Sequence, residues 1–165
     1  MNRYISICQF DDANANGYSL VVFYSSCPHM CPGCHNPGTW TNKDKGEYFT
    51  KEVQSKALEH FKNNEKYYDN LVLSGGDPLC DDNIRYALEF AKEFKLMFPD
   101  KTIWCYTGYN FEQLIEDDLR KEALILCDYI KCGRYIKELT CIDNIQYDIR
   151  LATSNQRIYK KGIDY

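Results

Sequence analysis

Short apolar runs alternate along this chain with longer segments of helical periodicity, and this alternation is the strongest constraint on its fold. The apolar runs lie at 20–24, 71–73, 102–106 and 126–131. Unbroken runs of this kind are typical of strands that are covered on both faces. Repeated strand–helix–strand units predict a parallel sheet. A closed eight-stranded barrel needs about 250 residues. The 165 residues present therefore predict an α/β fold that forms an open partial barrel of mostly parallel strands.

The segments between the apolar runs carry helix signals. Thr50 is the expected N-cap of a helix whose apolar face comprises Val53, Ala57, Leu58 and Phe61. A second helix is expected after the polar residues 81–83, with an inner face of Ile84, Ala87, Leu88, Ala91 and Phe94. Asn110 and Gln113 form a capping pair for a third helix, and the acidic pair at 117–118 is typical of a cap. Residues 4–9 are a candidate strand, whereas the pattern assigns no element to 135–165.

Composition limits the classes of function. The formal net charge of −4 argues against a nucleic-acid surface, which needs a strong basic excess. The apolar runs are too short to cross a bilayer, and residues 1–10 lack the features of a secretory signal. No repeat or Pro-rich linker divides the chain. We therefore expect residues 1–165 to form one cytoplasmic domain that binds neither nucleic acid nor membrane.

Three of the nine cysteines are crowded into one loop, at Cys27, Cys31 and Cys34. In a reducing compartment, thiols at such short spacing more often hold metal than form disulfides. Thiolates suit zinc or an iron–sulfur cluster. On a four-iron cube, three thiolates leave one iron free to chelate the amino and carboxylate groups of a methionine moiety. The alternative is a zinc site in which His29 or His35 is the fourth ligand. The other six cysteines, which are scattered, are expected to be buried reduced thiols.

Four unusual segments each follow a predicted strand directly. They are the cysteine loop, Ser-Gly-Gly-Asp-Pro at 74–78, Tyr-Thr-Gly-Tyr at 106–109 and Lys-Cys-Gly-Arg at 131–134. Parallel α/β folds bind ligands at the carboxyl edge of the sheet, so these segments are expected to converge on one site. Two glycines leave a bare backbone that a ligand can approach closely. Backbone carbonyls of the second segment, or the carboxylate of Asp77, are candidate acceptors for a ligand ammonium.

With these residues in place, the chain resembles the radical S-adenosylmethionine superfamily. The pattern Cys-x-x-x-Cys-x-x-Cys followed by a Gly-Gly-acid-Pro loop carries this resemblance. Within the superfamily the chain is most similar to the activating proteins of anaerobic ribonucleotide reductases. That narrower likeness rests on Cys-Pro-Gly-Cys-His-Asn at 31–36, Trp40, Ser-Gly-Gly-Asp-Pro-Leu at 74–79, Tyr-Thr-Gly-Tyr at 106–109 and Ser-Asn-Gln-Arg at 154–157. Two departures are Gly33, where many members have an aromatic residue, and Cys132, where members often have an acidic one.

The resemblance implies a fold of the radical S-adenosylmethionine type with a 4Fe–4S cluster on Cys27, Cys31 and Cys34. It implies that a flavodoxin-like donor reduces the cluster, which cleaves S-adenosylmethionine to a 5′-deoxyadenosyl radical. That radical generates a glycyl radical on the large subunit of the reductase. No catalytic side chain beyond the cluster and cofactor is expected. The expected S-adenosylmethionine contacts are Gly33, His35, Ser74, Gly75, Gly76, Asp77, Thr107 and Lys131.

The resemblance also suggests that residues 154–157 shape the cofactor side of the site or the docking face for the partner. Two other readings stay open from the sequence. One is a radical enzyme with a small-molecule substrate, similar to deazaguanine-forming synthases. The other is a zinc-binding interaction module without enzymatic activity.

Overall fold

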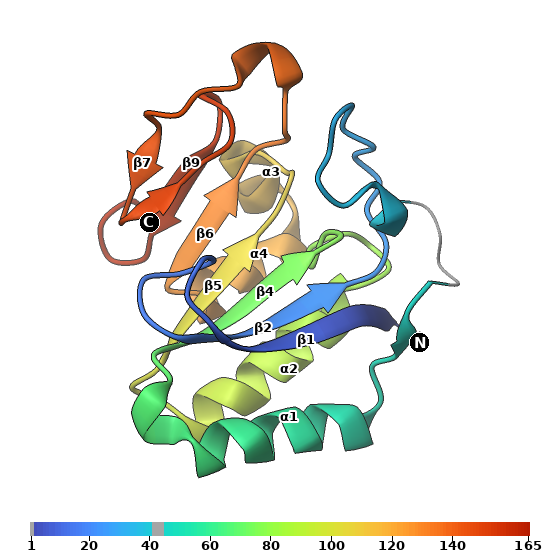
Figure 1. Cartoon of the computed structure of the whole chain (residues 1–165), viewed down its shortest axis with the longest axis vertical. Helices are drawn as coiled ribbons and strands as arrows, with labels where there is room; N and C mark the ends of the chain where they lie inside the picture. Colours follow the sequence, from blue (N-terminus) through green and yellow to red (C-terminus); the bar gives the residue numbers. More distant parts are fainter. Residues whose placement is uncertain (1, 41–44) are drawn as a thin grey trace.

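An open sheet of seven strands forms the centre of the fold (Figure 1). The computed structural model describes residues 2–40 and 45–165. In spatial order the strands are β3 (Glu47–Tyr48), β1 (Arg3–Asp11), β2 (Ser19–Tyr24), β4 (Asn70–Gly75), β5 (Thr102–Tyr106), β6 (Tyr129–Cys132) and β9 (Arg157–Lys160). The central strands β2, β4, β5 and β6 run parallel, and β1 and β9 pair antiparallel beside them. The fold is therefore mixed α/β, and its mostly parallel central sheet is not closed. That the sheet forms part of a barrel of the radical S-adenosylmethionine type stays a prediction.

Three of the four predicted strands are confirmed, and 102–106 coincides with β5. The candidate strand at 4–9 is part of β1, which pairs antiparallel with β2. The prediction that the fourth strand begins at residue 126 is wrong, because Leu126 ends helix α4 (Asp118–Leu126) and β6 starts only at Tyr129. The backbone amide of Cys127 still bonds the carbonyl oxygen of Ala123 at 2.8 Å, so the helical pattern extends into the apolar run.

The predicted helices are present between the strands. Helix α1 (Lys51–Asn63) begins at Thr50, whose side chain accepts a hydrogen bond from the backbone amide of Val53. Helix α2 (Ile84–Met97) follows β4, and helix α3 (Phe111–Glu116) opens with the expected capping box of Asn110 and Gln113. Asp117 caps α4 by accepting from the backbone amide of Arg120. Among the described residues, no helix is long and apolar enough to span a membrane.

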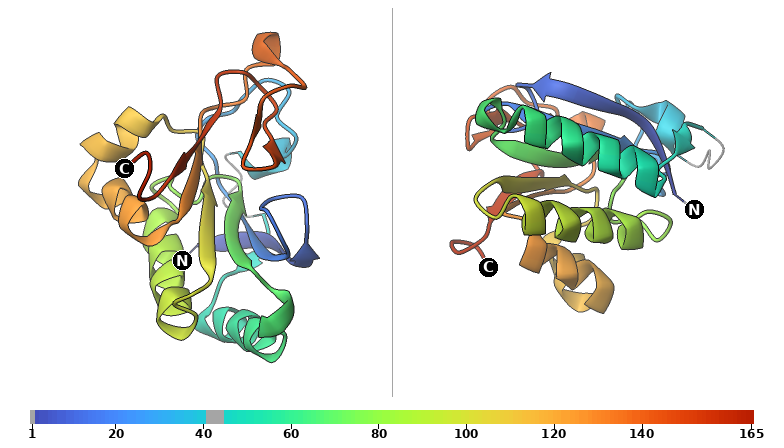
Figure 2. Two further views of the ribbon diagram at one scale, coloured as in Figure 1. Left: turned by 90° about the vertical axis from the view of Figure 1, so that its left-hand side faces the viewer. Right: turned by 90° about the horizontal axis from the view of Figure 1, so that it is seen from below.

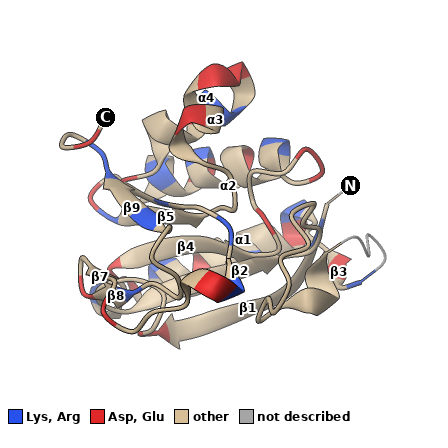
Figure 3. Cartoon of the chain, turned by 90° about the horizontal axis from the view of Figure 1, so that it is seen from above, with Lys and Arg blue, Asp and Glu red and all other residues tan. Residues whose placement is uncertain are grey.

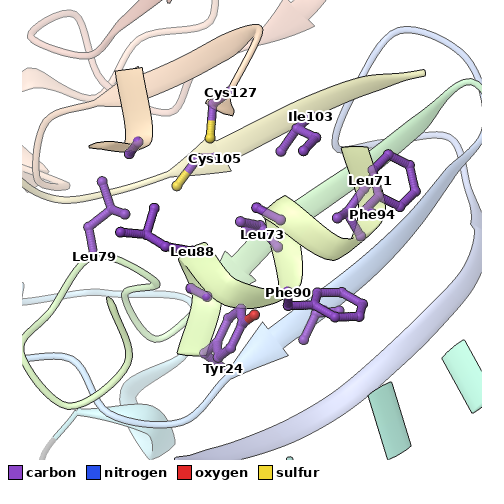
Figure 4. Packing of buried hydrophobic residues seen from close by; sticks show 14 of the residues in the cluster. Tyr24, Leu71, Leu73, Leu79, Leu88, Phe90, Phe94, Ile103, Cys105 and Cys127 are labelled. Carbon is purple, nitrogen blue, oxygen red and sulfur yellow. The ribbon is translucent and has the colours of Figure 1, made fainter. Parts of the chain in front are cut away.

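Alternate residues of the parallel strands pack on opposite faces of the sheet. On the helix-covered face, aligned residues such as Leu20, Leu71 and Ile103 belong to one buried core. Phe90 and Phe94 of α2 belong to the same core, where the side chains of Cys105 and Cys127 are neighbours (Figure 4). Because hydrophobic burial contributes about 25 cal/mol per Å² of apolar area, this core dominates the stability of the domain.

The opposite face is covered by irregular segments rather than helices (Figure 2). Val21, Val72 and Trp104 pack there against Ile149 and Leu151 of the C-terminal segment. That segment, residues 134–156, contains a short 3-10 helix, η3 (Lys137–Leu139), and the hairpin of β7 (Ile145–Gln146) and β8 (Ile149–Arg150). Such short elements carry no periodic pattern, which explains why the sequence assigned none there.

Uncharged amide side chains hold the C-terminal segment in place. The amide of Asn144 donates to the carbonyl oxygens of Thr153 and Gln156, at 3.0 Å each. The side-chain oxygen of Gln156 accepts from the backbone amides of Ala152 and Thr153, and its Nε2 donates to the carbonyl of Gly133 at 3.2 Å. Side-chain bonds thus supplement the short backbone ladder of β7 and β8 in this segment.

Candidate functional site

The parallel strands bring all four predicted loops to one edge of the sheet. Tyr24 at the end of β2 aligns with Gly75 of β4, and Tyr106 of β5 aligns with Lys131 of β6. Figure 3 views the molecule from this end. A cavity of about 160 Å³ lies between the loops. Of the predicted site residues, it is lined by Cys27, Cys31, Cys34, Ser74, Gly75, Gly76, Thr107 and Lys131.

Backbone bonds shape the cysteine loop. The amide of Cys27 donates to the carbonyl of Trp40 at 2.5 Å, and the amide of Cys34 donates to the carbonyl of Cys31 at 3.0 Å. Gly33 between them has φ +81°, a conformation that favours glycine. A Cβ at Gly33 would also lie 3.1 Å from the ring of Tyr135. The Tyr135 ring therefore occupies the space that a side chain at position 33 would need.

The two glycines of the 74–78 segment let it pack directly on the cysteine loop. A Cβ at Gly75 would lie 2.4 Å from the backbone nitrogen of Tyr24, and one at Gly76 would lie 2.1 Å from the carbonyl oxygen of Ser26. Two hydrogen bonds of 2.8 Å join the segments, from Gly76 to Tyr24 and from Asp77 to Ser26. A side chain at either glycine would thus point into the backbone of residues 23–26, so the missing side chains make room for this packing. The backbone of both glycines also lines the cavity.

Asp77 lies behind the cavity and is fully buried. One carboxylate oxygen accepts from the backbone amide of Leu79 at 2.8 Å and from the hydroxyl of Thr107 at 3.0 Å. The other contacts His29 Nε2 at 2.7 Å, the Thr107 hydroxyl at 2.9 Å and the backbone amide of Gly108 at 2.9 Å. With its lone pairs used by protein donors, the carboxylate is not directed at a ligand ammonium, the role considered for it from the sequence.

The two histidines named in the zinc alternative have different surroundings. His29 is buried, and its Nε2 is bonded to Asp77, so this nitrogen is not available to a metal without breaking that bond. His35 is exposed and packs near Tyr135, with 5.9 Å between the ring centroids. His35 lines a second cavity of about 240 Å³ that shares Cys34, Tyr106, Lys131, Tyr135 and Gln156 with the first.

Both cavities are lined by basic side chains. Lys131 and Arg134 line the first, and Lys131 and Arg150 line the second. Among the described residues, no Asp or Glu lines either cavity. Burial lowers the pKa of Lys131 to about 8, and its Nζ donates to the carbonyl of Gly133 at 3.1 Å. This lining favours anionic groups, such as a thiolate-bound cluster or a carboxylate.

The three thiols have the donor chemistry of an iron–sulfur site, whereas no three Cys, His, Asp or Glu side chains of the described residues are grouped closely enough to hold a single metal ion. Cys27, Cys31 and Cys34 are unpaired and partly exposed to the cavity. Burial raises the pKa of Cys27 to about 11, partly offset by a backbone hydrogen bond from His29. A metal must therefore displace the proton of this thiol when it binds. Cys132 belongs to the helix-covered core instead and does not line the cavity, and burial raises its pKa to about 12.

The predicted site residues did not include several that line the cavity, among them Arg134, Tyr135 and Gln156. Tyr135 lies in the stretch without a periodic pattern, so nothing in the sequence indicated its position over the cysteine loop. Gln156 lines both cavities and stands in the Ser-Asn-Gln-Arg segment, which was expected to shape the cofactor side. Asn155 of the same segment donates to the carbonyl of Arg134 at 3.0 Å. This segment thus braces the loop that follows β6.

Residues 13–159 match the family described as a 4Fe-4S single cluster domain. The chain is 34% identical over 128 residues to the anaerobic ribonucleoside-triphosphate reductase-activating protein of Vibrio cholerae, covering 78% of this chain and 81% of the relative. It is 34% identical over 137 residues to the protein of that name from Enterobacteria phage T4, covering 83% of each. The relative of that name from Escherichia coli K12 is 30% identical over 129 residues, covering 78% of this chain and 82% of the relative.

Proposed function

Because the chain belongs to the family of anaerobic ribonucleoside-triphosphate reductase-activating proteins, we propose that it activates such a reductase by radical S-adenosylmethionine chemistry. The observation that supports this most strongly is a single cavity lined by three thiols of one loop and by the backbone of the Ser-Gly-Gly segment. A metal-binding module without enzymatic activity needs no space for a second ligand between its thiols and a bare stretch of backbone.

Cys27, Cys31 and Cys34 would hold the 4Fe–4S cluster as thiolates. A bound cluster, with a flavodoxin-like protein as its electron donor, would supply the electron for reductive cleavage of S-adenosylmethionine to methionine and a 5′-deoxyadenosyl radical. That radical would take a hydrogen atom from a glycine of the reductase large subunit and so leave a glycyl radical there. The basic side chains around the cavity offset the negative charge of the thiolates.

The other lining residues would bind and orient S-adenosylmethionine. The backbone of residues 74–76 is a source of hydrogen-bond partners for its amino group, and Lys131 is a partner for its carboxylate. Gly33 and His35 lie on the cysteine loop, and Thr107 lies on the facing loop. Holding the reacting groups in a fixed arrangement lowers the barrier by a proximity effect. Asp77 would hold the surrounding loops in place through its bonds to His29, Thr107 and Gly108, without contacting S-adenosylmethionine.

The second cavity would admit the protein substrate. It lies between His35 of the cysteine loop and Arg150 of the C-terminal segment, and it joins the first cavity at Cys34. A glycine-bearing loop of the large subunit needs an approach of this kind, because its backbone has to come close to the cofactor. The open sheet, with no strand closing β3 onto β9 among the described residues, is compatible with such an approach.

Anaerobic purification and spectroscopy test the proposal. We expect a brown protein that contains iron and sulfide and that cleaves S-adenosylmethionine under reducing conditions. Incubation with an anaerobic reductase large subunit should then give the doublet of a glycyl radical in the electron paramagnetic resonance spectrum. A colourless protein with one zinc would refute the cluster. Cofactor cleavage without any glycyl signal would instead favour a small-molecule substrate.

A further inference from the structure

One buried carboxylate connects three of the four loops that form the site. Asp77 belongs to the segment after β4, and it bonds His29 of the cysteine loop and Thr107 and Gly108 of the loop after β5. The side chains of Asp77 and His29 are only 1% and 3% exposed. Water therefore does not compete for these bonds, and removing one partner leaves a buried polar group unsatisfied.

His29 is also fixed by packing. A Cβ at Gly108 would lie 2.3 Å from the His29 ring, so only a glycine there leaves room for the imidazole. On another side the ring meets Tyr109 edge to face, with 4.7 Å between centroids. The ring of His29 is thus held by Asp77, Gly108 and Tyr109 together, and it lies between two of the three cysteines in sequence.

The loop after β6 joins the same network through the backbone. The amide of Thr107 donates to the carbonyl of Lys131 at 2.9 Å, and the amide of Gly133 donates to the carbonyl of Tyr109 at 3.0 Å. A displacement of His29 would therefore shift residues 74–77 through its bond to Asp77. It would also shift the segment that carries Lys131, because Asp77 bonds Thr107 and Thr107 bonds the carbonyl of Lys131. Networks of this kind transmit a local shift, because buried hydrogen bonds act together.

We propose that Asp77 and His29 are a positioning pair that fixes the three thiols relative to the S-adenosylmethionine subsite. The inference rests on the proposed function, since it concerns the cluster and this cosubstrate. Asp77 acts through His29 and Thr107 and touches neither the cluster nor the cosubstrate. Loss of the pair leaves the three cysteines free to ligate iron. The remaining backbone bonds from the 74–78 segment reach Tyr24 and Ser26, which precede the first cysteine, so the part of the loop that carries the cysteines is no longer held against the Ser-Gly-Gly backbone by His29.

Equilibrium dialysis with radiolabelled S-adenosylmethionine tests this on oxidised, cluster-loaded protein, so the readout is binding rather than turnover. His29→Leu removes the donor at similar size, and His29→Gln keeps an N–H at the position of Nε2. His60→Leu is the matched control, because His60 Nε2 also bonds a neighbour, the Tyr68 hydroxyl at 3.0 Å, and lies outside the site. Iron and sulfide per chain and the thermal unfolding midpoint are measured for each variant.

We expect His29→Leu to retain at least half of the wild-type iron and to raise the dissociation constant at least tenfold. His29→Gln should remain within threefold of wild type, and His60→Leu within twofold. A dissociation constant within twofold of wild type for His29→Leu would overturn the proposal. If His29→Leu takes up no iron, Asp77→Asn decides in its place, because it changes no residue of the cysteine loop. A dissociation constant within twofold of wild type for Asp77→Asn would then overturn the proposal.

Two further outcomes separate the causes. Weak binding by Asp77→Asn together with normal binding by His29→Leu would show that the carboxylate acts without His29, and would overturn the positioning pair. A wild-type protein that holds iron and sulfide but does not bind S-adenosylmethionine would refute the proposed function itself, before any variant is compared.

Discussion

Replacement of Gly76 by alanine should destabilise the domain more than its position in a loop suggests. The added Cβ would lie 2.1 Å from the carbonyl oxygen of Ser26 and 3.1 Å from that of Tyr24, so the two segments must separate. Their separation weakens two hydrogen bonds of 2.8 Å. Each is worth about 1 kcal/mol, and the desolvation cost of buried groups left unpaired adds to this. We expect a loss of about 3 kcal/mol in the free energy of unfolding.

Urea and thermal unfolding of the metal-free protein, under anaerobic reducing conditions, measure this loss. For a domain of this size, about 3 kcal/mol corresponds to a midpoint lowered by roughly 6–12 °C. Gly162→Ala is the control for backbone strain without a steric clash, since Gly162 has φ +79° and no atom within 4 Å of the added Cβ. The backbone strain alone should cost about 1 kcal/mol there. Equal effects for the two variants, or a loss below about 0.5 kcal/mol for Gly76→Ala, would refute the steric reasoning.

Three further predictions follow from the site and the fold. Cys31→Ser should reduce iron per chain to below half of wild type and abolish cleavage of S-adenosylmethionine. Cys8 does not line the cavity, so Cys8→Ser should change neither quantity. Retained cleavage in Cys31→Ser would contradict the ligand assignment. Thr50→Ala removes the cap of α1 and should lower the free energy of unfolding by about 1 kcal/mol in urea titration; an unchanged value would mean that the cap contributes nothing. Gln156→Ala removes three hydrogen bonds of the C-terminal segment and should cost about 2 kcal/mol. It should also speed amide hydrogen exchange at Ala152 and Thr153, and unchanged exchange would count against that role.

The central part of the fold was predictable because its signals are local. The apolar run at 102–106 coincides with β5, and the Asn110–Gln113 pair opens α3, since strand burial and helix capping depend on neighbouring residues. The start of β6 was predicted too early, because apolar residues such as Leu126 and Cys127 fit the end of a helix as well as a strand. Length and periodicity alone do not separate these two structures over a few residues.

The candidate site was predictable to the level of its loops. The rule that parallel strands end at one edge correctly brought the cysteine loop and the 74–78 segment together. The direction of a single side chain was not predictable, and Asp77 faces His29 rather than the cavity. Tyr135 was missed because its position depends on how the C-terminal segment crosses the sheet. Contacts between residues this far apart in sequence leave no periodic trace.

The amide bonds of the C-terminal segment determine how the wall of the site responds to its surroundings. Asn144, Gln146 and Gln156 carry no charge, so proton activity does not change their donors and acceptors. Ionic strength screens charges but has little effect on neutral dipoles in contact. Acidification or added salt should therefore weaken surface ion pairs such as Lys92 with Glu122. The amide hydrogen bonds that hold the C-terminal segment against the cavity should stay unchanged.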